Sequence, residues 1–199
     1  MNPDRILLLS LLLVLAVSFV ATSIRAYPSG PPPGVTGGFG ERTCSQKGCH
    51  DSYELNAGKS LGLGDVLISD FPKQYQPGMT YPIQVTITHT QDREVWGFQL
   101  AARVKEAGAQ AGELQPMDAN TQIVPEKGIQ YIEHTLEGTH SNVFEFNWVA
   151  PSSPVGDIIL HAAGNAGDGS LSPDGDYIYS ASATIAAPSD RGGPTRRAP

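Results

Sequence analysis

Hydrophobic and polar residues alternate with a period of two along most of the chain, and no stretch keeps a helical period. In the clearest example, Ile83, Val85 and Ile87 alternate with Gln84, Thr86 and Thr88. This alternation is typical of a strand with one face in the core and the other in solvent. The pattern predicts about seven strands, at 65–69, 83–88, 96–104, 129–136, 143–149, 157–163 and 177–185.

Turn-forming residues separate the predicted strands. Gln76-Pro-Gly78, Ala150-Pro-Ser-Ser-Pro154 and Ser172-Pro-Asp-Gly175 each place Pro and Gly between two of them, where these residues end regular structure and favour a reversal of direction. Short strands with such breaks predict an all-β fold, an antiparallel β-sandwich. The sequence shows no internal repeat.

The N-terminus has the pattern of a signal peptide. Ile6 to Ala21 is almost wholly apolar, but the run is short for a membrane span. We therefore expect residues 1–26 to direct export and to be removed, with the mature protein in the periplasm, secreted or on the surface of a bacterium. No second apolar run of spanning length follows, so no stable membrane insertion is expected after cleavage.

Composition divides the remainder into three segments. Residues 27–60 begin with a Pro/Gly-rich run from Tyr27 to Arg42, which is either a linker or an ordered arm laid over a flat ligand, because glycine lets backbone approach closely. Residues 61–187 contain the predicted strands. Residues 188–199 have almost nothing to bury and are predicted to be disordered.

The charge balance narrows the classes of partner. The chain carries 13 Lys+Arg against 20 Asp+Glu, and it has no basic stripe, so nucleic acid is not an expected partner. The acidity would suit docking to a basic redox partner protein. Nothing in the sequence resembles a Ser-His-Asp set, a phosphate loop or paired hydrolase carboxylates, which argues against a hydrolytic enzyme.

The only two cysteines lie in Cys44-Ser-Gln-Lys-Gly-Cys49-His50. Two thiols followed by an imidazole resemble the Cys-x-x-Cys-His motif of covalent haem attachment, in which thioethers anchor the porphyrin and the histidine binds iron. Four residues separate these cysteines instead of two. A local disulfide with His50 as a bystander, or a zinc site, remains an alternative, because a free thiol pair does not persist in an oxidising compartment.

A second axial ligand would decide what such a haem does. His134 shares a predicted strand face with Ile132, and a rigid strand can fix an imidazole. His134 is therefore the predicted second ligand. The other candidates are His89, His161 and Met117.

Several short motifs together resemble one known family. They include Pro32 to His50, Tyr75 to Tyr81, Trp96-Gly-Phe-Gln99, Tyr131-Ile-Glu-His-Thr135, Phe146 to Pro151 and His161-Ala-Ala-Gly-Asn165. In order and spacing they are similar to bacterial Reeler-like proteins, those with choice-of-anchor V domains. The resemblance implies an immunoglobulin-like β-sandwich preceded by a cysteine-histidine segment with the features of a c-type haem site.

These observations lead to a predicted function with one main alternative. The prediction is an exported monohaem c-type cytochrome-like protein for electron transfer, not an enzyme. Cys44 and Cys49 would anchor haem c, and His50 and His134 would ligate its iron. The alternative is a non-haem β-sandwich adhesion or binding module, with a Cys44–Cys49 disulfide and loops that contact a protein or glycan.

Overall fold

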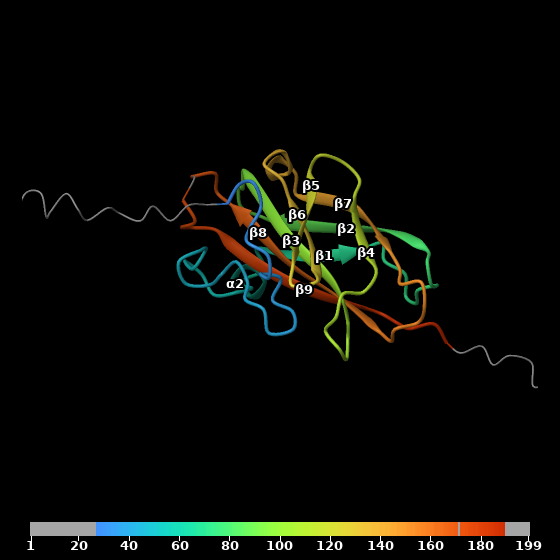
Figure 1. Ribbon diagram of the computed structural model, residues 1–199. Coiled ribbons are helices and arrows are strands. Elements are labelled where there is room, and N and C mark those ends of the chain that lie inside the picture. The colour runs from blue at the N-terminus through green and yellow to red at the C-terminus, as the bar shows by residue number, and fades with distance from the viewer. Residues whose placement is uncertain (1–26, 171, 190–199) are drawn as a thin grey trace, which may run out of the picture.

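Two antiparallel β-sheets pack face to face in the described part of the chain, residues 27–170 and 172–189 of a computed structural model (Figure 1). The predicted signal peptide, 1–26, and nearly all of the predicted tail lie outside the described residues. The all-β, antiparallel sandwich predicted from the alternation is confirmed. One sheet has the order β1 (Gly64–Ser69), β2 (Thr80–His89), β7 (Val143–Val149), β4 (Glu113–Pro116). The other has the order β5 (Thr121–Glu126), β6 (Ile129–His134), β3 (Val95–Val104), β8 (Ile158–Gly167), β9 (Tyr177–Ile185).

Each of the predicted strands corresponds to an observed one, and β7 and β9 have the predicted bounds. Two strands, β4 and β5, were not predicted. Both lie at the edge of a sheet, and each contains a proline, Pro116 or Pro125. Proline lacks the N–H that a central strand needs, so it is tolerated at edges and weakens the sequence signal of a strand. Among the described residues there are also two short helices, α2 (Ala57–Ser60) and the 3-10 helix η1 (Glu137–His140).

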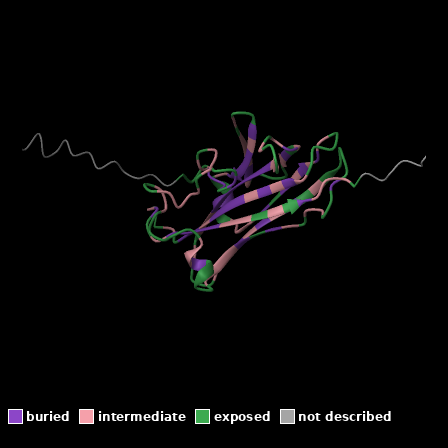
Figure 2. Ribbon diagram, turned by 90° about the horizontal axis from the view of Figure 1, so that it is seen from below, coloured by how far each residue is buried: buried purple, intermediate pink, exposed green. Residues whose placement is uncertain are grey.

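The core fills the space between the two sheets. Phe98 of β3 stacks on Phe144 of β7, with ring centroids 4.3 Å apart, and Trp148 of β7 packs edge-on against Tyr75. All four side chains are almost fully buried. Buried positions alternate with more exposed ones along strands such as β2 and β7 (Figure 2), as expected of strands with one face in the core.

An ordered N-terminal arm, residues 27–43, covers the outer face of the five-stranded sheet (Figure 1). Gln99 of β3 anchors it, because its Oε1 accepts the Val35 N–H at 2.9 Å and its Nε2 donates to the Pro32 carbonyl at 3.1 Å. Gly38 allows the close approach: a Cβ there would lie 2.4 Å from the His161 ring. The Pro/Gly-rich run is therefore an ordered arm, and it lies against the protein's own sheet.

No helix among residues 27–170 and 172–189 has both the length and the apolar character needed to cross a bilayer.

Candidate functional site

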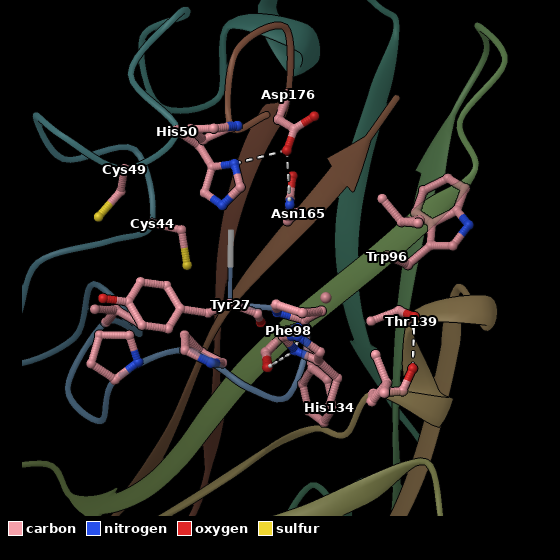
Figure 3. A pocket seen from close by; sticks show the side chains of 18 of the residues that line it. Tyr27, Cys44, Cys49, His50, Trp96, Phe98, His134, Thr139, Asn165 and Asp176 are labelled. Atoms are coloured by element: carbon pink, nitrogen blue, oxygen red, sulfur yellow. Dashed lines mark hydrogen bonds and ion pairs between the residues drawn. The ribbon is translucent and has the colours of Figure 1, made fainter. Parts of the chain in front are cut away.

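A cavity of about 570 Å³ lies where the arm meets one end of the five-stranded sheet. Its volume falls within the range of small-molecule sites. The walls are mostly apolar, with Tyr27 and Pro32 from the arm and Trp96 and Phe98 from the first residues of β3 (Figure 3). All four residues predicted as a site from the sequence line this cavity: Cys44, Cys49, His50 and His134.

Cys44 and Cys49 lie in a turn closed by backbone hydrogen bonds. The His50 N–H donates to the Cys44 carbonyl at 3.0 Å, and the Cys49 N–H donates to the Gln46 carbonyl at 3.0 Å. Both cysteines are free thiols, so the disulfide of the alternative interpretation is not formed here. Burial, and then the neighbouring Cys49, raise the pKa of the Cys44 thiol to about 12. Cys44 is therefore a neutral thiol near pH 7, which makes it a poor nucleophile.

His50 projects from this turn toward the end of β8 (Figure 3). Its Nδ1 lies 2.8 Å from Oδ2 of the buried Asp176, although the approach is too bent for a well-directed hydrogen bond. Asp176 is itself held in place, because it accepts the Asp168 N–H at 3.1 Å and the Asn165 side-chain Nδ2–H at 3.2 Å. The carboxylate therefore orients the imidazole, and Nε2 points into the cavity (Figure 3).

His134, at the end of β6, is engaged by backbone groups on both ring nitrogens. Its Nδ1 lies 3.1 Å from the Phe98 N–H donor, and its Nε2 lies 3.3 Å from the Tyr27 carbonyl. Both contacts are satisfied when Nδ1 accepts and Nε2–H donates. Burial lowers the pKa of His134, which favours this neutral form. Close packing adds to the constraint, since a Cβ at Gly97 would lie 2.8 Å from the ring.

The other candidates from the sequence do not line the cavity. His89 has its Nδ1 2.6 Å from the Tyr179 hydroxyl. His161 lies on the outer face of β8 against Phe39 of the arm, with ring centroids 5.5 Å apart. Met117 is largely exposed.

Asp176 and Asn165 are the site residues that sequence reasoning did not connect with the cysteine motif. Pairing of β8 with β9 places Asn165 opposite Ile178, which brings both polar side chains under the turn that carries His50. No local spacing links them, because the contact depends on how the sheet and the arm come together. The only available signal was a polar, Gly-rich stretch between two strands.

Fold and cavity together define a β-sandwich module with a pocket of ligand size. Residues 65–164, half of the chain, match the family model described as the Reeler domain. The chain belongs to the Reeler domain family.

Solved structures similar to this chain include reeler domains. A human F-spondin reeler domain is 20% identical over 62% of this chain and 87% of that chain, with a TM-score of 0.46. The Reelin-N domain of F-spondin is 22% identical over 62% of this chain and 84% of that chain, with a TM-score of 0.46. A cohesin from Acetivibrio cellulolyticus scaffoldin B is 12% identical over 58% of this chain and 96% of that chain, with a TM-score of 0.38. No match is found among curated protein sequences.

The prediction of haem c, and with it iron binding and cytochrome-like electron transfer, is wrong. The family is that of the Reeler domain, and within residues 27–170 and 172–189 no group of three or more His, Cys, Asp or Glu side chains is placed to hold a metal ion. The physical reason lies in the ring contacts: His134 Nε2 lies against the Tyr27 carbonyl. The expected redox partner protein depended on the haem and is not carried forward.

Proposed function

We propose that this protein is an exported binding module that holds a small, mostly apolar ligand in the pocket beneath its N-terminal arm. The observation that carries this proposal is the cavity of about 570 Å³, lined mainly by apolar side chains and by a few convergent polar groups. A preformed apolar cavity with few polar groups is the usual form of a small-molecule site. Like the non-haem alternative from the sequence, this proposal makes the protein a binding module. It differs in the binding site, which is the pocket and not the sandwich loops.

Binding is favoured over catalysis by the state of the nucleophile candidates. A cysteine beside a histidine and an aspartate could in principle attack a substrate, as in thiol hydrolases. That chemistry needs a thiolate, whereas burial raises the pKa of Cys44 to about 12. His134 is occupied by the Phe98 and Tyr27 backbone and is not poised to move a proton. We therefore propose that the pocket binds its ligand without changing it.

Two finer assignments belong to the same proposal. The apolar run from Ile6 to Ala21 supports export through a signal peptide. Motifs such as Trp96-Gly-Phe-Gln99 and Phe146-Asn-Trp-Val-Ala-Pro151 support a place among the bacterial choice-of-anchor V proteins within the Reeler family.

The test is a calorimetric titration of the mature protein with 2-methoxynaphthalene, a neutral apolar probe. We expect saturable binding of one probe per chain. Replacing Leu136, an exposed residue that lines the cavity, with aspartate should weaken binding about tenfold, because the probe then loses apolar contact and meets a charge.

A matched control comes from the other sheet. Leu67 of β1 is 60% exposed, close to the 59% of Leu136, and it is not part of the cavity wall. Leu67→Asp should therefore bind the probe as the unmodified protein does. Absence of saturable binding to the unmodified protein, or an equal loss in both variants, would refute a site in this cavity.

A further inference from the structure

We infer that the ligand of this pocket is a neutral aromatic molecule with an O–H or N–H group that donates a hydrogen bond to His50 Nε2, and that a second donor on the ligand would pair with Asn165 Oδ1. This inference rests on the proposed function, since it names the chemical class that the same pocket takes. Asp176 links the two acceptors, because its carboxylate contacts both side chains from behind.

The first acceptor is the imidazole of His50. Asp176 Oδ2 lies 2.8 Å from Nδ1, and a carboxylate at this distance favours the ring proton on Nδ1 over Nε2. With the single ring proton on Nδ1, Nε2 presents its lone pair to the cavity, into which this atom points (Figure 3). A donor on the ligand complements that lone pair, whereas a second acceptor would be repelled.

The second acceptor is the side-chain amide of Asn165. Its Nδ2 donates to Asp176 Oδ2 at 3.2 Å, which fixes the orientation of the amide because Oδ1 would be repelled by the carboxylate. Oδ1 is shielded from solvent and has no hydrogen-bond partner among the described residues. A buried acceptor without a partner costs about 1–3 kcal/mol, and a donor on the ligand would remove that cost.

The remaining walls define the rest of the ligand. Trp96, Pro28 and Pro32 contribute apolar parts of the wall, and no Lys or Arg of the described residues lines the cavity. An anionic ligand would therefore lack a cationic partner and would meet the Asp176 carboxylate. Aromatic and proline surfaces suit a flat ring, so a neutral phenol-like or indole-like molecule fits the whole lining.

The test compares 2-naphthol with 2-methoxynaphthalene at pH 8 by calorimetry. The two probes share a ring system, but only 2-naphthol has a donor. We expect 2-naphthol to bind the unmodified protein about tenfold more tightly, the effect of one good hydrogen bond. His50→Phe keeps an apolar ring and removes the acceptor. It should bring the dissociation constants of the two probes within about twofold of each other.

The matched control is His140→Phe, because His140 also lines the cavity but lies on η1, away from Asp176. It should keep the preference for 2-naphthol. Asn165→Ala removes only the second acceptor and should keep the preference for 2-naphthol, which has a single donor, and thermal unfolding checks that each variant folds. Equal affinity of the unmodified protein for the two probes would overturn the inference while the pocket still binds. If neither probe binds, the proposed function itself is refuted.

Discussion

Glu133 of β6 is a carboxylate under the N-terminal arm and is only 2% exposed. Its Oε2 accepts from Gln99 Nε2 at 2.8 Å, and its Oε1 accepts from Gln122 Nε2 at 3.3 Å. These bonds favour the charged form, but burial outweighs them and raises the pKa of Glu133 to about 7. The side chain therefore titrates near neutral pH inside the interface between arm and sheet.

This shift makes stability depend on pH at one residue. The pKa of Glu133 is higher in the folded chain than its ordinary value of 4.5. Its contribution to the free energy of unfolding is therefore full below pH 4.5 and is lost as the pH rises through about 7. We expect the unmodified protein to lose stability relative to Glu133→Gln between pH 5 and pH 8, measured by urea unfolding.

The control is Glu145→Gln on β7, an exposed carboxylate that accepts a hydrogen bond from Gln84 at 3.0 Å. Its stability should follow that of the unmodified protein across the same interval. If the unmodified protein and Glu133→Gln differ in free energy of unfolding by the same amount at pH 5 and at pH 8, Glu133 does not titrate in this range.

A second residue-scale prediction concerns Cys44. Because burial and Cys49 raise the pKa of its thiol to about 12, only a minute fraction is thiolate at pH 8. In a Cys49→Ser variant, where burial still acts on the remaining thiol, iodoacetamide should modify Cys44 at least about tenfold more slowly in the folded protein than in urea. Mass spectrometry of timed samples measures this. Equal rates in both states would show an accessible, ordinary thiol and would reopen a reactive role for Cys44.

At the scale of the element, the arm depends on one buried amide. Gln99 is fully buried, and it bonds to Gly34, Val35 and Pro32 of the arm. Gln99→Met keeps the length of the side chain and removes these bonds. We expect the sandwich to remain folded while the amides of Gly34 and Val35 exchange at least about tenfold faster in hydrogen-exchange mass spectrometry, because each net bond contributes about 1 kcal/mol.

Gln84→Met is the control, since Gln84 lies on the other sheet and pairs with the exposed Glu145. It should leave the exchange of the arm unchanged. If Gln99→Met also leaves the protection of Gly34 and Val35 unchanged, then apolar contacts and not this amide hold the arm.

The elements also show where sequence reasoning succeeds. β2 and β7 were predictable because each buries one face, and burial of one face imposes alternation on the sequence. β4 has one buried apolar side chain, Leu114, and so it leaves no period to detect. Residue types alone drew attention to the turn from Cys44 to His50, which lies at the cavity. Its contact with Asp176 was not, because that contact depends on tertiary packing of the turn on β8 and β9.

For the whole molecule, the cavity wall and the buried Trp148 lie in different parts of the sandwich, because no residue of β7 lines the cavity. Trp96 and Phe98 at the start of β3 line the cavity, whereas Trp148 at the end of β7 is fully buried in the core and donates to the Ala111 carbonyl at 2.8 Å. Ala111 lies beyond the end of β3, and its N–H donates to the Ala102 carbonyl. Phe98 therefore belongs to both the core and the cavity wall, whereas Trp148 belongs to the core alone.

This separation predicts that stability and binding respond to different substitutions. Trp148→Phe should lower the free energy of unfolding by about 2 kcal/mol, because it leaves a void and an unpaired carbonyl, yet it should bind 2-methoxynaphthalene with unchanged affinity. The chain has 2 tryptophans, so the tryptophan fluorescence of this variant comes from Trp96 alone and reports directly on the cavity wall. Probe binding should then quench or shift nearly all of the remaining emission. A loss of affinity that parallels the loss of stability would show instead that core and pocket form one cooperative unit, in which the sandwich must be intact along its whole length to hold the ligand.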